Sequence, residues 1–168
     1  MSTAQSKPEL RSEEKAIVES FEKLGEKAKL SFSKPGRLKF SVHRENLVEI
    51  AKNLRDEFHF EQCTNVTGTD FPKEKQLEIA YHFGSLGELG LRGTIVTLTV
   101  RVPVDDPVLP SLIELFPSAN YHEREAAEMI GCVFTGHPNL TRLLLPEDWN
   151  DIPPMLKSYR LPGRLEGE

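Results

Sequence analysis

The densest group of side chains capable of chemistry lies between Tyr121 and Glu128, where the sequence reads Tyr-His-Glu-Arg-Glu-Ala-Ala-Glu. On a helix, Arg124 and Glu128 stand four residues apart and can form an ion pair, and Glu125 and Glu128 share a face. A carboxylate-bridged metal site would need Glu-x-x-His motifs from two helices. The sequence holds one such segment in reversed order, His122-x-x-Glu125, and therefore favours an ion-paired interface or a solvated helix face.

A second candidate, His137, lies between Gly136 and Pro138. No carboxylate or nucleophile stands at a known catalytic spacing from it, so a ring hydrogen-bonded within a turn is the simpler interpretation. A small soluble enzyme that uses His122, Glu125 and His137, with a metal, is the alternative function. A free-standing binding module is a third hypothesis, and it predicts a monomer whose C-terminal segment is ordered.

Glycines recur through a segment that superficially resembles a phosphate-binding loop, at positions Gly84, Gly87, Gly90 and Gly93. No Lys-Ser or Lys-Thr pair follows them, and the next residues alternate as a strand does, whereas a phosphate loop precedes a helix. We therefore expect a mobile hairpin loop here.

Hydrophobic periodicity predicts the elements that must position these residues. Apolar steps of three and four residues predict helices over 12–29, 44–58, 108–116 and 121–130, the last with Ser118 as its N-cap and Gly131 as its stop. Alternation predicts strands over 30–32, 38–43, 58–70, 76–84 and 94–102. Cleanly alternating strands with short turns favour an α+β fold, with a mixed, largely antiparallel sheet and helices packed on one face.

The last part of the chain is unlike the rest, because nine of the twelve prolines fall after residue 102. We expect an α+β domain over residues 1–130, followed by an extended C-terminal arm over residues 131–168. The arm mixes apolar side chains with prolines, so it would expose them to water unless a partner covered them. Trp149 and Tyr159 would then be anchors and Arg142 a rim residue. The alternative is an arm folded back on its own sheet.

Composition excludes several classes of function. The formal net charge of -5, without a basic stretch, argues against nucleic-acid binding. Cys63 and Cys132 are too few for an iron–sulfur cluster and are not spaced as a zinc motif, so we expect no redox centre in this chain. No run approaches the roughly 18 apolar residues of a membrane span, and the first ten residues are polar, so we expect the chain to stay in the cytosol.

The run Glu123-Arg124-Glu125-x-x-Glu128-Met129-Ile130-x6-His137 resembles the signature of the 30 kDa subunit family of respiratory complex I, the C subunit of bacterial NADH–quinone oxidoreductase. The resemblance continues through residues 136–149 and, upstream, through 104–108 and 70–72. Two features depart from the family pattern. Thr141-Arg142 stands where two adjacent basic residues are usual, and residues 154–162 only approximate the usual closing run.

The resemblance implies a non-catalytic scaffold subunit that holds no cofactor and whose arm wraps around a large 49 kDa-type subunit. Iron–sulfur clusters, and a nickel–iron centre in hydrogenase-type relatives, would belong to partner subunits. The resemblance extends to the equivalent subunits of archaeal membrane-bound hydrogenases, sulfur-reducing complexes and F420H2 dehydrogenases. The chain would lie on the cytoplasmic side of the membrane, attached only through the complex, with no nucleic acid and no small-molecule substrate. The expected partner-binding residues are Glu123, Arg124, Glu125 and Glu128, the arm-launching turn Gly136, His137 and Pro138, and the anchors Arg142, Trp149 and Tyr159.

Overall fold

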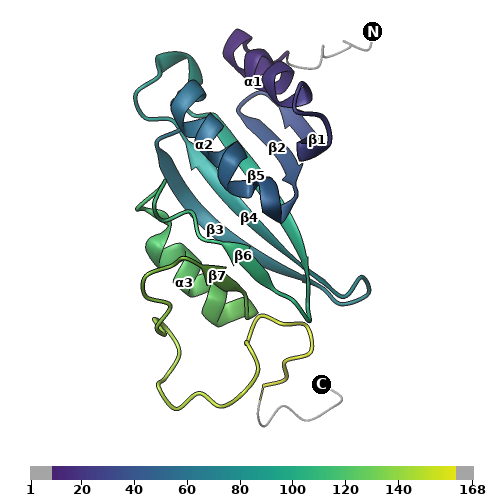
Figure 1. Cartoon of the computed structure of the whole chain (residues 1–168), viewed down its shortest axis with the longest axis vertical. Coiled ribbons are helices and arrows are strands. Elements are labelled where there is room, and N and C mark those ends of the chain that lie inside the picture. The colour runs from purple at the N-terminus through teal and green to yellow at the C-terminus, as the bar shows by residue number, and fades with distance from the viewer. Residues whose placement is uncertain (1–8, 162–168) are drawn as a thin grey trace, which may run out of the picture.

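The computed structural model describes residues 9–161 as an α+β fold (Figure 1). Residues 1–8 of the expected domain and 162–168 of the expected arm lie outside the described residues. The helices are α1 (Ser12–Glu22), α2 (Leu47–Phe58) and α3 (Ala119–Ile130), with short 3-10 turns at η1 (Gly25–Lys27), η2 (Arg44–Asn46) and η3 (Leu89–Leu91). The strands are β1 (Ala28–Lys34), β2 (Arg37–Val42), β3 (Gln62–Phe71), β4 (Gln76–Gly84), β5 (Ile95–Pro103), β6 (Val108–Pro110) and β7 (Val133–Thr135).

Five strands form the main sheet in the order β1-β2-β5-β4-β3. Every neighbouring pair is antiparallel except β2 and β5, which run parallel with Arg37 opposite Ile95. A second, two-stranded sheet pairs β6 and β7 in parallel. The predicted mixed, largely antiparallel sheet is confirmed, and the Lys34-Pro35-Gly36 turn joins β1 to β2 as a hairpin.

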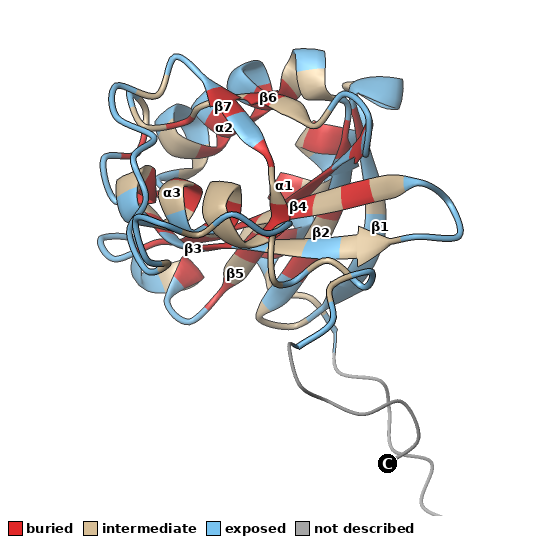
Figure 2. Cartoon of the chain, turned by 90° about the horizontal axis from the view of Figure 1, so that it is seen from below, coloured by how far each residue is buried: buried red, intermediate tan, exposed pale blue. Residues whose placement is uncertain are grey.

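One face of the sheet packs against the helices (Figure 1). The alternation of β4 and β5 buries the side chains that the sequence places on one side, namely Leu77, Ile79, Tyr81, Phe83, Val96, Leu98, Val100 and Val102. The stripe of α2, with Leu47, Ile50, Ala51 and Leu54, is buried as well. In Figure 2 the buried parts of the ribbon, in red, lie in the strands and helices toward the interior of the fold. Burying this apolar surface is the main force that holds the helical layer on the sheet.

Helix α3 lies against the edge strand β3 at a very close distance. A β-carbon at Gly68 would come within 2.5 Å of Ile130 Cγ1, so only glycine lets the helix approach this far. At the other end of α3, Ser118 occupies the N-cap position, but its hydroxyl accepts the backbone N–H of Cys63 on β3, at 3.1 Å. The predicted stop at Gly131 is confirmed, with φ at 87°. These contacts fix α3 on the sheet.

Two predicted helices differ from the structure. The first ends at Glu22 instead of continuing to Lys29, because Gly25 takes a left-handed φ of 60° and the chain enters β1 at Ala28. The prediction of a helix over 108–116 was wrong. Val108–Pro110 forms β6, because β7 supplies backbone partners, and only a single helical turn follows, closed by the bond from Phe116 N–H to the Leu112 carbonyl.

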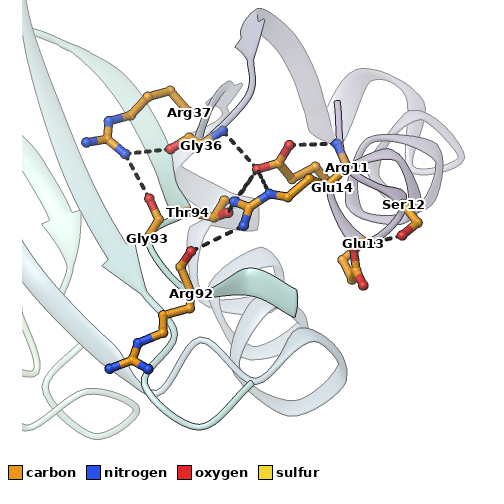
Figure 3. Close-up of polar contacts among 9 residues, drawn as sticks. All are labelled: Arg11, Ser12, Glu13, Glu14, Gly36, Arg37, Arg92, Gly93 and Thr94. Atoms are coloured by element: carbon orange, nitrogen blue, oxygen red, sulfur yellow. Dashed lines mark hydrogen bonds and ion pairs between the residues drawn. The ribbon is translucent and has the colours of Figure 1, made fainter. Parts of the chain in front are cut away.

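Helix α1 is fixed to the sheet by Glu14, whose carboxylate is fully buried (Figure 3). It accepts hydrogen bonds from the Arg11 guanidinium at 2.6 Å, the Gly36 N–H at 2.8 Å and the Thr94 hydroxyl at 2.9 Å. The Arg11 backbone N–H donates to its second oxygen. Burial by itself would raise the pKa of Glu14, but these donors outweigh it and lower the pKa to about 2. The first helical turn therefore depends on an ionised Glu14.

Candidate functional site

Helix α3 carries the residues of the predicted interface, and the first of them, Glu123, is fully buried. Its carboxylate accepts hydrogen bonds from the Tyr81 hydroxyl at 3.1 Å, the Ser111 hydroxyl at 2.5 Å and the Leu112 N–H at 2.8 Å. Burial raises the pKa of Glu123, although the hydrogen bonds from these three donors act in the opposite direction. The side chain therefore joins α3, β4 and the segment after β6, and its partners all lie within the chain.

Arg124 and Glu128 both contact the C-terminal arm. The Arg124 guanidinium donates to the carbonyl oxygens of Thr141 and Arg142, each at 3.0 Å. The Glu128 carboxylate accepts the backbone N–H groups of three successive residues, Leu143, Leu144 and Leu145, the last at 2.7 Å. The two side chains that the sequence places as a possible ion pair therefore bind the backbone of the arm, one through its carbonyls and the other through its amides.

Replacing Glu128 with alanine is expected to loosen the arm, because three amides lose their common acceptor. Trypsin cleavage after Arg142 should become about tenfold faster, as expected for a local opening that costs about 1.4 kcal/mol less. Peptide mapping of a limited digest measures this. The matched control is Glu125→Ala on the exposed side of the same helix, which should leave the cleavage rate unchanged. Equal rates for the two variants would contradict this assignment.

The Gly136-His137-Pro138 segment forms a tight turn at the start of the arm. Gly136 has φ at 84°, a left-handed conformation that favours glycine. The Asn139 N–H donates to His137 Nδ1 at 3.1 Å, so this nitrogen is unprotonated and Nε2 carries the proton toward the Asn120 carbonyl oxygen at 3.2 Å. The ring thus joins the turn to the first residues of α3, as the hydrogen-bonded histidine of the simpler interpretation would.

The three predicted anchors of the arm, Arg142, Trp149 and Tyr159, make their contacts within the arm itself. Arg142 donates to the carbonyl oxygens of Pro146, Glu147 and Trp149 at 2.8–2.9 Å and so closes a loop. The Trp149 indole N–H donates to the Asp151 carbonyl oxygen at 2.9 Å. The rings of Trp149 and Tyr159 lie with centroids 5.8 Å apart. These contacts shape the arm, and they leave its outer side chains free for other contacts.

Apolar side chains line the outside of the folded arm, and these exposed residues are Leu140, Leu143, Leu144, Ile152, Met155 and Leu161. Beside the arm, a cavity of about 580 Å³ opens between the β3–β4 hairpin and the residues after β5, with Pro72, Val104 and Leu156 among its lining residues. Exposed apolar side chains that gather in one segment are typical of interaction sites.

The residues of the alternative enzyme do not form a catalytic group. Glu125 is exposed, and both ring nitrogens of His137 are engaged with backbone groups. Among residues 9–161, no three His, Cys, Asp or Glu side chains are placed to hold a metal ion. Cys63 and Cys132 are buried, and burial raises the pKa of each thiol to about 12, so neither is a thiolate nucleophile at neutral pH.

The sequence analysis did not predict several contacts of this site. Tyr81 lies on the apolar face of an alternating strand, and a buried tyrosine hydroxyl needs a hydrogen-bond partner. Its position in the sequence therefore indicated that a polar residue packs against this face. No pattern indicated the backbone bonds that return the arm to the domain, from Met155 N–H to the Met129 carbonyl oxygen and from Lys157 N–H to Asp70. Such long-range contacts have no local sequence signature.

The fold and this site define a class of protein: a small α+β domain whose C-terminal arm is folded back on one helix and presents apolar side chains outward. The chain belongs to the family described as respiratory-chain NADH dehydrogenase, 30 Kd subunit, whose model matches residues 40–165. The resemblance seen in the sequence is thereby confirmed. Within the described residues, no helix is both long enough and apolar enough to cross a bilayer.

Among curated relatives, the chain is 39% identical to the C subunit of NADH-quinone oxidoreductase from Streptomyces coelicolor and 42% identical to that from Saccharopolyspora erythraea, each over 132 residues. These alignments cover 76% of this chain and 51% of each relative, so the chain spans about half the length of these curated relatives. The corresponding protein of Roseiflexus castenholzii is 42% identical over 123 residues, which cover 70% of this chain and 67% of that protein.

Two solved structures share the fold. A trypsin-resistant fragment of Nqo5 is 26% identical, with a TM-score of 0.65, over 76% of this chain and 98% of that one. A chain in the structure of the membrane-bound sulfane sulfur reductase, an archaeal respiratory membrane complex, is 24% identical, with a TM-score of 0.70, over 88% of this chain and 85% of that one. At 24% identity the second likeness shows the fold alone.

Proposed function

We propose that this chain is a non-catalytic structural subunit in the peripheral arm of a complex I-like, ion-translocating oxidoreductase of the membrane. The observation that carries the proposal is the C-terminal arm, whose backbone is held by Arg124 and Glu128 while Leu143 and Leu144 are exposed. Family membership and the relatives from NADH-quinone oxidoreductases support it.

The partner on this surface would be the large 49 kDa-type subunit, with iron–sulfur subunits beside it. The iron–sulfur clusters, and the nickel–iron centre if the complex is of the hydrogenase type, would belong to those subunits, and the chain itself would hold no cofactor. It would lie on the cytoplasmic side and reach the membrane only through its partners. Arg142, Trp149 and Tyr159 would act by shaping the arm, and Leu143 and Leu144 would make the contact.

Removal of the arm tests this function, and the position of β7 determines the best point of truncation. A chain that ends after Gly131 would lose β7 and with it the second sheet, so a cut after Pro138 is the cleaner experiment. We expect the shortened chain to keep its fold but to lose co-purification with the large subunit by more than about tenfold, because buried apolar contacts would disappear. Mass spectrometry of the affinity-purified complex identifies the proteins that remain bound and gives the result.

Single substitutions give a matched comparison within the full-length chain. Leu144 is 58% exposed in the arm and Phe32 is 48% exposed on β1, so aspartate at either site should leave the fold intact. Leu144→Asp should reduce association with the large subunit, whereas Phe32→Asp should not. Recovery of an intact, active complex from the chain cut after Pro138 would refute the proposed function.

A further inference from the structure

The two most exposed large apolar side chains among residues 9–161 lie far from the arm, in the glycine-spaced loop between β4 and β5. Leu86 is 74% exposed and Leu89 is 79% exposed. The loop leaves the end of the nine-residue strand β4 opposite to the β3–β4 hairpin that the arm contacts. A strand of this length spans about 30 Å, so the loop and the arm contacts lie at opposite ends of the sheet (Figure 1).

The loop is held in place on both sides. On one side, Glu61 accepts the Leu86 N–H at 3.1 Å. On the other, Gly90 packs on the Glu13 side chain of α1, where a β-carbon would come within 2.6 Å of Glu13 Oε1. Leu91, one residue further on, is buried in the core. These contacts therefore hold the backbone that carries the two leucines. The sequence predicts a mobile loop here, and the structure shows a loop attached on both sides.

Charges around the leucines restrict what can cover them. Glu88 lies between them and is exposed, and Glu61 and Glu13 flank the loop. Arg92 follows it, Arg37 donates to the Gly93 carbonyl oxygen, and Arg11, which is paired with Glu14, donates to the Arg92 carbonyl oxygen (Figure 3). With Glu14 included, four carboxylates against three guanidinium groups leave a net negative charge beside the leucines, which disfavours an anionic lipid surface. A second copy of this chain would bring the same carboxylates face to face. A protein with an apolar pocket and a basic rim would complement both features.

We infer that Leu86 and Leu89 form a second docking point, which binds another protein subunit through an apolar pocket rimmed by Lys or Arg. This inference rests on the proposed function, because it requires the chain to work inside an assembly. It adds a geometric role: the chain bridges two partners, one at the arm and one at the opposite end of the sheet.

Photo-cross-linking in the assembled complex tests the inference. Benzoylphenylalanine is placed at position 89 in the loop, at 144 in the arm, and at the exposed position 19 on α1 as the control. We expect positions 89 and 144 to give adducts with subunits other than this chain, and position 19 to give none. An adduct from position 89 with lipid or with a second copy of this chain, or no adduct while 144 gives one, would overturn the docking point alone. Failure at both 89 and 144 would count against the proposed function.

A second measurement uses substitutions that leave the fold intact. Leu86→Ser with Leu89→Ser should weaken retention of the loop's partner by about tenfold for each leucine, because each loses the burial of a large apolar side chain. Glu88→Lys should weaken it further as ionic strength falls, since the reversed charge would face a basic rim. Phe32→Ser is the matched control. Retention equal to that of the unmodified chain in the double variant would overturn the inference.

Discussion

Replacing Glu123 with alanine is expected to lower the free energy of unfolding by about 3–5 kcal/mol, the largest effect of any single substitution proposed for this chain. The variant would leave the Tyr81 hydroxyl and the Leu112 N–H buried without their acceptor, and it would also remove the acceptor of the half-buried Ser111 hydroxyl. Each unsatisfied buried donor costs about 1–3 kcal/mol. Urea unfolding of the full chain at neutral pH, followed by far-UV circular dichroism, gives the difference.

Two control variants separate this effect from a general loss of charge on α3. Glu123→Gln keeps the shape and one carbonyl acceptor, so it should cost about 1–2 kcal/mol. Glu125→Ala removes an exposed carboxylate two residues away and should change stability by less than about 0.5 kcal/mol. If Glu123→Ala proved as stable as Glu125→Ala, the buried carboxylate could not be what joins α3 to β4.

Loss of the Glu14 charge is expected to remove about 3 kcal/mol of stability as the pH falls from about 4.5 to about 2. The pKa of Glu14 is lowered from 4.5 to about 2 in the folded chain, and each unit of pKa difference is worth about 1.36 kcal/mol. Because the folded pKa is the lower one, the contribution is fully present above the unfolded pKa. It disappears as the pH falls through the folded pKa.

Comparison with Glu14→Gln isolates this group from the other carboxylates. The difference in unfolding free energy between the natural chain and the variant should be about 3 kcal/mol at pH 7 and should approach zero near pH 2. Glu19→Gln, an exposed position on the same helix, should show no such pH-dependent difference. A difference that stayed constant from pH 7 to pH 2 would show that Glu14 does not act through its charge.

The strands of the main sheet and helix α2 could be predicted from the sequence because the pattern that defines them is local. The alternation in residues 76–84 and 94–102 marks which side chains are buried, and β4 begins and ends where that pattern does. The stripe from Leu47 to Phe58 has a helical period that fits no strand. Side-chain period alone therefore predicted the layer that positions the site.

The features of the fold and the site that the sequence did not predict depend on contacts between residues far apart in the chain. Residues 108–110 form a strand because β7 pairs with them, although their apolar spacing also suits a helix. The role of Glu123 follows from Tyr81 and Ser111, neither of which is its neighbour in sequence. The motif indicated where the important residues of α3 are, but not that Arg124 and Glu128 bind the backbone of the arm.

The single parallel pair of the main sheet, β2 with β5, has a consequence for synthesis on the ribosome. The β1–β2 hairpin and helices α1 and α2 emerge early, but the strand that pairs with β2 follows only after β3 and β4. Until β5 has left the exit tunnel, the edge of β2 and the apolar face of α2 lack their partners. The N-terminal half therefore waits for the second half before it can fold, and chaperone binding to nascent chains that end before β5 should be stronger than to those that end after it.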